Sequence, residues 1–297
     1  VDDGSRDRSA VIARRFASLD GRFRLLALPH AGLVPALNAG LERCRGAIVA
    51  RMDADDLMHR RRLAEQLALL RERPELAAAG CHVRVFPRRL VGPGLREYEK
   101  WINAVDAPET LRREAFVECP VAHPTLAVRR ELLRETGYRE MGWPEDYDLV
   151  LRLLEAGHDI GVLPRRRLLW RHGPSRLSRK APDYAPERFT ECKAHFLARS
   201  FLAGCEHFIL WGYGATGRAL CAALERHGKR PSHILELHPG RLGNRIRGAP
   251  VLPPDALPRL PRAPLLVSVA GAAPRAEIRA ALNARGFVET RDYLCCA

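Results

Sequence analysis

The sequence predicts an α/β protein made of two parts, in which strands of a mainly parallel sheet alternate with helices. Short apolar runs alternate with helical patterns of about ten residues, and this alternation is typical of βαβ units. The 297 residues suffice for one large or two ordinary domains, and 46% hydrophobic with 6% aromatic residues suits a soluble globular protein. No apolar run approaches the ~20 residues that a membrane-spanning helix needs.

The first part, residues 1–204, shows the alternation most clearly. Leu37 and Leu41 are four residues apart, as expected on one face of a helix, and Pro108 is expected to open a new helix at its first turn. Ligands bind beyond the carboxyl ends of parallel strands, so the residues that follow the strands are the site candidates. The expected helices cover residues 9–18, 34–44, 60–73, 98–116, 149–156 and 186–202, and the expected strands cover residues 22–28, 47–52, 75–86 and 126–128.

The second part, residues 205–297, starts afresh as a strand, a glycine turn and a helix. Gly212, Gly214 and Gly217 follow an expected strand at 208–211 with the spacing Gly-x-Gly-x-x-Gly, and Glu236 lies near the end of the next strand. This is the context of a dinucleotide-binding fingerprint. The segment is long enough for about half a Rossmann unit. Three readings stay open, namely NAD binding, a regulatory nucleotide or sugar nucleotide, and a module without ligand that serves structure or oligomerisation.

The formal net charge of +14 suggests an anionic partner, such as a nucleotide diphosphate or the surface of an acidic membrane. Of the 49 basic residues only four are lysines, a skew that resembles codon bias as much as function. The arginines neither interleave with aromatic residues in a stripe nor occur in a motif that reads DNA or RNA. Nucleic acid is therefore not an expected partner.

Eight cysteines are spread along the chain without any Cys-x-x-Cys pair. This pattern argues against a disulfide framework and against a zinc site. The final pair, Cys295 and Cys296, is expected to be a pair of solvent-exposed thiols at a frayed terminus. The chain opens with acidic residues rather than with a basic and then apolar leader, so the expected compartment is the reducing cytoplasm.

The densest functional signal is a group of three carboxylates after an expected strand. Asp53, Asp55 and Asp56 directly follow the apolar run Ala47–Ala50 and Arg51-Met52. Side chains alternate along an extended backbone, so the two carboxylates of Asp-x-Asp point the same way. Mg²⁺ or Mn²⁺ held by one or two carboxylates usually completes its shell with water and phosphate oxygens. The alternative is a solvated acidic turn.

Two further acidic pairs stand at positions suited to a site. Asp2 and Asp3 follow what reads as the end of a strand, although an aspartate that caps the next helix would look the same. Glu145 and Asp146 stand where a loop becomes a helix, from which a carboxylate can reach into a cleft. Helix N-termini stabilise carboxylates, so capping is the rival reading. A useful base at Asp146 would need partial desolvation to regain proton affinity.

These motifs together resemble the family 2 inverting glycosyltransferases of bacteria, which have the GT-A fold. They lie in the family's order and at its usual intervals over about residues 1–180. The resemblance implies a GT-A-type, mainly parallel sheet with flanking helices over residues 1–204, followed by the small Rossmann-like half domain. It also implies that the family's first strand and helix, which supply part of the nucleotide-base pocket, are missing in front of Val1. The matching stretches are Val1–Ser5, Gly32–Gly40, Ala50–Asp56, Pro120–Thr125, Glu145–Leu149 and Leu151-Arg152.

The family implies transfer of a sugar from a nucleotide-diphosphate donor to the hydroxyl of a glycan or lipid-linked acceptor, with a divalent cation and inversion at the anomeric carbon. Cell-surface polysaccharide or glycolipid synthesis is the implied setting. In the matched positions Asp2 and Asp3 would contact the nucleotide, and Asp53 would lie toward the ribose. Asp55 would be closest to the metal.

Matched positions later in the chain supply the remaining roles. Asp146 corresponds to the catalytic base, with Glu145 beside it, because the acceptor hydroxyl must lose its proton as the new bond forms. His172 corresponds to a metal ligand or leaving-group contact, and the alternative is a plain surface histidine. Either Arg171 or Arg176 would neutralise the diphosphate. His123 either shapes the acceptor side or is a core histidine.

Two other functions stay open. The chain could be a nucleotide-sugar-binding scaffold without catalysis, or an NAD-dependent oxidoreductase built on residues 207–297. A peripheral contact with the inner face of the membrane would suit the basic charge and a lipid-linked acceptor. The sequence predicts neither the sugar nor the oligomeric state.

Overall fold

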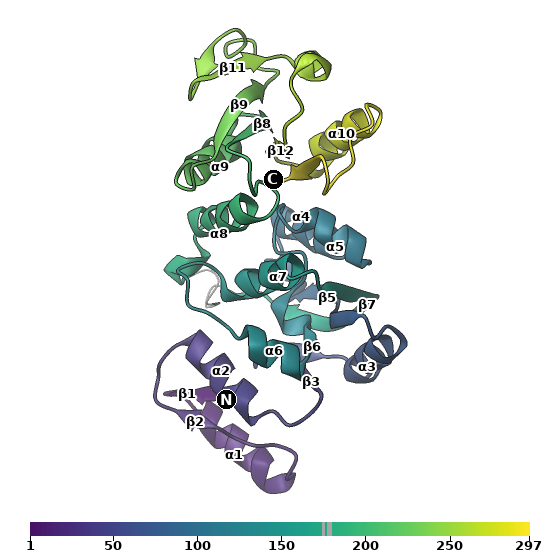
Figure 1. Cartoon of the computed structure of the whole chain (residues 1–297). Coiled ribbons are helices and arrows are strands. Elements are labelled where there is room, and N and C mark those ends of the chain that lie inside the picture. Colours follow the sequence, from purple (N-terminus) through teal and green to yellow (C-terminus); the bar gives the residue numbers. More distant parts are fainter. Residues whose placement is uncertain (174–175, 177–179) are drawn as a thin grey trace.

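The structure is a computed structural model that describes residues 1–173, residue 176 and residues 180–297. It contains a small two-stranded sheet, a five-stranded sheet and a six-stranded sheet, arranged one after another along an elongated molecule (Figure 1). Helices flank each sheet. The predicted α/β class is confirmed.

The chain begins with the two-stranded sheet. Strand β1 (Asp2–Asp3) pairs in parallel with β2 (Ala27–Leu28), and α1 (Ser9–Leu19) connects them. Helix α2 (Leu33–Arg43) follows and lies near α6 (Figure 1). Its expected position at residues 34–44 was correct to one residue at each end.

The five-stranded sheet has the order β3-β6-β5-β7-β4. Its helices are α3 (Arg62–Glu72), α4 (Pro93–Ile102), α5 (Pro108–Glu114), α6 (Arg130–Thr136), α7 (Glu145–Glu155) and α8 (Pro186–Arg199). Its strands are β3 (Ile48–Ala50), β4 (Leu57–Met58), β5 (Leu76–Phe86), β6 (Ala127–Arg129) and β7 (Asp159–Arg171).

The prediction of a mainly parallel sheet is wrong for this part of the chain. Only β5 and β7 pair in parallel within the described sheet, whereas β3 with β6, β6 with β5, and β7 with β4 are antiparallel. The physical reason is that β6 enters between β3 and β5 from the opposite end, after η2 (His123–Thr125). An alternation of strands and helices predicts neighbours, but it does not predict the direction of a strand that arrives through a loop.

The six-stranded sheet has the order β10-β11-β9-β8-β12-β13, and all of its pairings except β10 with β11 are parallel. Here the expected Rossmann-like arrangement of strand, turn and helix is present. Its helices are α9 (Ala215–Glu225) and α10 (Ala272–Asn283). Its strands are β8 (His207–Trp211), β9 (Arg230–Leu235), β10 (Arg245–Ile246), β11 (Ala249–Leu252), β12 (Leu265–Val267) and β13 (Tyr293–Cys295).

Helix α8 joins the two parts of the chain, because it packs against α7 of the first part and α9 of the second. Cys192 and Phe196 belong to the apolar core of the first part, whereas Ala194 and Leu197 belong to a core built mainly from residues 202–296. Figure 1 shows α8 between the two sheets, with α4 and α5 nearby. The predicted border near residue 204 falls in the connection from α8 to β8.

The carboxyl terminus differs from the sequence-based expectation. Cys295 and Cys296 are both buried, because β13 adds to the edge of the six-stranded sheet beside β12. They are therefore not frayed, solvent-exposed thiols. All eight cysteines are free in the structure. Within the described ranges, no helix has the length and apolar character required to cross a bilayer.

Candidate active site

A cleft of about 580 Å³ opens beside the ends of β3 and β7 and the start of α7. Its volume lies within the range of small-molecule sites. The lining combines acidic, basic and aromatic side chains, most of them from different elements. The acidic residues are Asp53, Asp55, Glu118, Glu145 and Asp146, the basic ones are Arg51, His123, His172 and Arg176, and the aromatic ones are Tyr98, Trp170, Tyr184 and Phe189.

Asp53 and Asp55 reach the cleft from the loop that continues β3. The backbone N–H of Arg51 donates to Leu126 O at 2.8 Å, which holds the start of this loop against the turn before β6. The carboxylate of Asp53 forms an ion pair with the Arg51 guanidinium. The carboxylate of Asp55 is exposed and has no hydrogen bond or ion pair to any described residue. Of the two, Asp55 is therefore the freer to bind a ligand.

Asp56 serves the structure of the loop and lies outside the cleft lining. Its side chain is buried, and its Oδ1 accepts a hydrogen bond of 2.7 Å from the backbone N–H of Arg171 on β7. Its Oδ2 is buried without a hydrogen-bond partner in the described structure. Burial, followed by the nearby charges of Asp53 and Asp55, raises the pKa of Asp56 to about 6. This contact joins the acidic loop to the end of β7.

Asp146 has the electrostatic environment that a general base requires. Its carboxylate lies in the second residue of α7, and its Oδ1 accepts a hydrogen bond of 2.8 Å from the N–H of Tyr147. Burial, and then the negative charge of Glu145, raises the pKa of Asp146 from 3.8 to about 7, against the opposing effects of that N–H and of Arg51. The partial desolvation that a base at this position needs is therefore present.

Glu145 differs from its neighbour because it has hydrogen-bond donors on both oxygens. Burial disfavours its charge, but His123 and Tyr184 outweigh this effect and lower the pKa of Glu145. The hydroxyl of Tyr184 donates to its Oε2 at 2.5 Å, and Nδ1 of His123 lies 3.5 Å from its Oε1. Two adjacent carboxyls thus have opposite pKa shifts, a pattern that often separates a fixed charge from an acid–base group.

His123 is a buried residue that nevertheless borders the cleft. Its Nε2 lies 3.0 Å from the hydroxyl of Tyr138, and burial lowers its pKa. The neutral ring therefore bridges Tyr138 and Glu145. This supports the reading of a core histidine that positions Glu145 at the cleft wall.

The residues of the cleft fit a divalent cation that is completed by substrate. Within the described residues, no group of three or more His, Cys, Asp or Glu side chains is arranged to hold a metal alone. Mg²⁺ and Mn²⁺, however, need only one or two carboxylates when phosphate oxygens and water fill the shell. Asp55 offers an uncommitted carboxylate and Asp53 lies two residues away on the same cavity wall. His172 also lines this cavity.

Other predicted residues lie beside the cleft and are not part of its lining. The carboxylate of Asp3 accepts hydrogen bonds from the N–H groups of Ala31 at 2.8 Å and Gly32 at 3.0 Å, and these bonds lower its pKa. It therefore shapes the loop that leads to Leu33, which does line the cleft. Asp2 is half-buried in β1 and is likewise absent from the lining.

The two candidate arginines occupy different positions. The guanidinium of Arg171 lies 4.5 Å from the ring centroid of Phe86, and its Nε donates to Asp55 O at 2.6 Å. Arg176 lines the cleft, where its guanidinium lies 4.6 Å from the ring centroid of Trp170. The geometry therefore favours Arg176 over Arg171 as the arginine that meets an anionic ligand.

The glycine motif of the second part is explained largely by packing. A Cβ at Gly217 would lie 2.3 Å from Gly212 O, so α9 can pack on β8 only with glycine there. The Glu236 carboxylate accepts a hydrogen bond of 3.1 Å from the N–H of Tyr213 and forms an ion pair of 2.7 Å with Arg241. These contacts occupy the carboxylate that a ribose hydroxyl would need as its acceptor. Gly214, by contrast, faces open space.

Several cleft residues were not predicted from the sequence. Glu118 precedes the recognised Pro120–Thr125 stretch and could have been suspected from that position. Tyr98, Trp170 and Tyr184 come from three separate elements, and no local pattern marks them. They became visible only because α4, β7 and η4 (Pro182–Tyr184) meet around the cleft.

The structure is an α/β protein with a cleft that is lined by the half-buried Asp53, the exposed Asp55 and a carboxyl of raised pKa, Asp146. Comparison with known proteins relates the first 137 residues to a family. Residues 1–137 match glycosyl transferase family 2, and over these residues the chain carries a glycosyl transferase family 2 (GT-A) domain.

The chain is similar to several bacterial glycosyltransferases. It is 30% identical over 158 residues to the amylovoran biosynthesis glycosyltransferase AmsE of Erwinia amylovora. This alignment covers 52% of this chain and 56% of that protein. It is 29% identical over 190 residues to the O-antigen biosynthesis glycosyltransferase WbnJ of Escherichia coli. This alignment covers 64% of this chain and 70% of that protein. The chain thus spans little more than half the length of the first relative.

Among solved structures, a match was found to a mannosyltransferase, PcManGT from Pyrobaculum calidifontis, in complex with GDP-Man and Mn²⁺. The identity is 20% and the TM-score is 0.45, with 76% of this chain and 58% of that chain covered.

Proposed function

We propose that the chain is a metal-dependent inverting glycosyltransferase that moves a sugar from a nucleotide-diphosphate donor to an acceptor hydroxyl. The observation that carries the proposal is that Asp53, Asp55 and Asp146 line one cavity of about 580 Å³, although they come from two segments about ninety residues apart. The similarity to AmsE and WbnJ, whose names refer to amylovoran and O-antigen biosynthesis, supports a role in cell-surface polysaccharide synthesis.

The donor would bind with its diphosphate near the acidic loop. Asp55, helped by Asp53, would hold Mg²⁺ or Mn²⁺ together with phosphate oxygens and water. When bound, the cation supplies positive charge that stabilises the diphosphate as it leaves. Arg176 lines the same cavity and would add a second positive group, whose planar donors suit phosphate oxygens.

The transfer step needs a base on the acceptor side of the cleft. The acceptor oxygen attacks the anomeric carbon as the bond from that carbon to the diphosphate oxygen breaks, and the acceptor proton passes to a carboxylate oxygen of Asp146. The bonding electrons remain on the diphosphate. With a pKa near 7, Asp146 is ionised often enough to accept a proton and basic enough to take it. Attack from the face opposite the diphosphate inverts the anomeric carbon.

Glu145 would keep its charge during this step and raise the proton affinity of Asp146. Its hydrogen bonds with Tyr184 and His123 fix it in place, so it acts as a positioning and electrostatic residue. The acceptor would enter on the side of the cleft formed by aromatic residues, since rings offer flat apolar surfaces to sugars. These residues are Tyr98, Trp170, Tyr184 and Phe189.

The test is transfer by the full-length protein with a panel of nucleotide-diphosphate sugars, with and without Mn²⁺. Asp146→Asn should keep donor affinity and lose transfer, because the amide preserves shape but cannot accept the proton. Asp106→Asn, an exposed aspartate outside the cleft lining, is the matched control and should retain transfer. Near-normal turnover by the Asp146→Asn variant would refute the assignment of the base.

The same experiment separates the alternative functions. A nucleotide-sugar-binding scaffold would bind a donor with Mn²⁺ but show no turnover with any acceptor. An NAD-dependent oxidoreductase built on residues 207–297 would bind NAD and be indifferent to Asp55→Ala. The engagement of Glu236 by Tyr213 and Arg241 speaks against the second alternative.

A further inference from the structure

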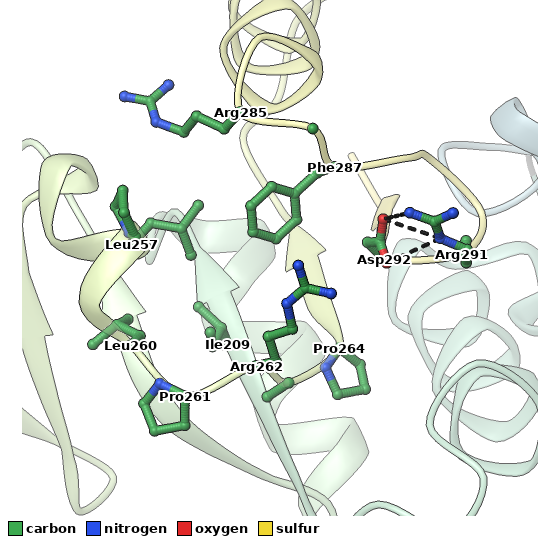
Figure 2. A pocket seen from close by; sticks show the side chains of 13 residues that line it. Ile209, Leu257, Leu260, Pro261, Arg262, Pro264, Arg285, Phe287, Arg291 and Asp292 are labelled. Atoms are coloured by element: carbon green, nitrogen blue, oxygen red, sulfur yellow. Dashed lines mark hydrogen bonds and ion pairs between the residues drawn. The ribbon is translucent and has the colours of Figure 1, made fainter.

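A second cavity, of about 610 Å³, lies in the carboxyl-terminal part and belongs to none of the chemistry described above. Figure 2 shows it between two stretches of chain that converge over the six-stranded sheet. Ile209 of β8 forms its floor. One wall consists of residues 257–264, and the other consists of residues 285–287 with the turn at 291–292. None of the glycines of the Gly-x-Gly-x-x-Gly motif contributes to it.

Three prolines reduce the number of backbone N–H groups in the wall formed by residues 257–264. Pro258, Pro261 and Pro264 recur at every third position along it. Proline has no N–H to satisfy and a nearly fixed φ, so this wall can face an apolar ligand without an unpaired donor and with little freedom to collapse. Leu260 and Phe287 pack against the buried cluster that contains Ile209. The cavity is therefore a gap at the edge of a formed core.

One cation in the cavity lacks a direct ion pair, although it interacts at longer range with the carboxylate of Asp292. The side chain of Arg262 extends from the proline-rich wall toward the ring of Phe287 (Figure 2). Arg262 has no hydrogen bond or ion pair to any residue that the structure describes. Asp292, which also lines the cavity, is already bonded to the Arg291 guanidinium at 2.7 Å and to the N–H of Val288 at 2.8 Å.

Arg285 adds a further positive charge at the rim. Its Nη1 donates to Ala281 O of its own helix at 2.8 Å, and its Nη2 lies 3.6 Å from the exposed carboxylate of Asp255. Such an exposed ion pair contributes little in water, so an anionic ligand could compete for this arginine. The cavity therefore combines apolar walls with an excess of positive charge, because three arginines and one aspartate line it.

We propose that this cavity binds an amphiphilic anion, namely an alkyl or acyl chain that ends in a carboxylate or a phosphate. The chain would lie against Leu260, Phe287 and the prolines, and the anionic end would meet Arg262. Pockets of this size that are lined mainly by apolar groups, with few polar ones, are typical of small-molecule sites. A charged arginine at one end fixes the direction of the ligand through charge-assisted hydrogen bonds. This site is independent of the proposed transfer reaction.

The experiment is calorimetric titration of the full chain with four ten-carbon probes below their micelle concentrations. The probes are decanoate, decyl phosphate, decyltrimethylammonium and decanol. Both anions should bind with a negative heat-capacity change, and the cation and the alcohol should bind at least roughly tenfold more weakly. The ratio between the two anions then distinguishes a carboxylate from a phosphate ligand.

Two variants locate the binding. Arg262→Gln should weaken both anions by roughly tenfold or more, while Arg259→Gln, a nearby exposed arginine outside the lining, should leave them unchanged. Phe287→Ala should weaken all four probes, because it removes part of the apolar wall. Thermal unfolding of each variant checks that the fold is retained.

Three results would overturn the proposal. The first is equal binding of the cationic and the anionic probes. The second is anion binding that Arg262→Gln does not change. The third is absence of anion binding together with dimerisation that Phe287→Ala abolishes, which would assign the cavity to a second copy of the chain.

Discussion

Replacement of Asp146 by asparagine should stabilise the protein at alkaline pH although it removes transfer. The native carboxyl holds its proton up to a pKa of about 7, whereas the unfolded chain releases it near 3.8. Between these values the native state binds more protons, so the contribution of Asp146 to stability falls as the pH rises. Asparagine has no charge to bury and can still accept the N–H of Tyr147.

The size of the effect follows from the shift. A pKa that rises from 3.8 to about 7 means that the ionised form of Asp146 is disfavoured in the native state by a free energy of about 4 kcal/mol. The side chain keeps some contact with solvent, which screens the charge, so we expect about half of this, or ~2 kcal/mol. Most of the gain should appear between pH 5 and pH 8, and we expect the stabilisation to grow by about 1 to 2 kcal/mol over that interval.

Urea unfolding at pH 5 and pH 8 measures this difference, and Glu145→Gln is the matched control. Because the pKa of Glu145 is lowered, its charge stabilises the native state above the unfolded pKa, so glutamine should destabilise the protein at pH 8. The transfer rate of the wild-type protein should rise with pH through about 7, as Asp146 loses its proton. Glu145→Gln should move this rise to lower pH, because it removes a negative charge that raises the pKa of Asp146. If Asp146→Asn destabilises equally at both pH values, the reasoning from burial is wrong.

Three further outcomes are expected from other parts of the structure. Asp55→Ala should abolish metal-dependent donor binding and leave the melting temperature nearly unchanged, because its carboxylate has no protein partner; a large loss of stability in thermal unfolding would contradict this. Lys193→Met should lower the free energy of unfolding by about 3 kcal/mol, because the buried ammonium donates hydrogen bonds to Val117 O at 2.7 Å and to Cys296 O at 3.2 Å. An unchanged midpoint of urea unfolding would show that this link between the two parts is unimportant. Gly217→Ala should lower the free energy of unfolding by about 1 to 3 kcal/mol, because the added methyl group overpacks against β8, whereas Gly214→Ala should lower it by less than ~1 kcal/mol. If calorimetry ranks the two variants in the opposite order, the packing role of the motif is refuted.

The sequence predicted the acidic part of the cleft better than the fold that carries it. Asp53, Asp55 and Asp146 were recognised because each stands at the end of a strand or the start of a helix, and local patterns mark such junctions. The direction of β6 could not be predicted in this way, because strand direction depends on how a loop returns to the sheet. The mainly parallel five-stranded sheet was therefore a wrong expectation.

The electrostatics of the cleft required the three-dimensional structure. The raised pKa of Asp146 arises from burial and from Glu145, and the lowered pKa of Glu145 depends on Tyr184, which is 39 residues away in the chain. Likewise, the sequence could not choose between Arg171 and Arg176. Their different positions depend on the packing of one on Phe86 and of the other on Trp170.

The apolar cavity of the carboxyl-terminal part also had no sequence signal of its own. The prolines at 258, 261 and 264 form no functional motif, and their spacing of three residues gains meaning only when Phe287 closes the opposite side. Conversely, the glycine motif was the strongest local signal of this part. Its first and third glycines are needed for the close approach of β8, α9 and the residues after β12.

The most direct test of the central claim is the position of Mn²⁺ and a nucleoside diphosphate bound to the full chain, determined by anomalous diffraction. The proposed function predicts a manganese peak beside Asp55 and a diphosphate in the cleft that Asp146 lines. A manganese ion and nucleotide bound instead at the Gly212–Gly217 turn, with the cleft empty, would contradict it.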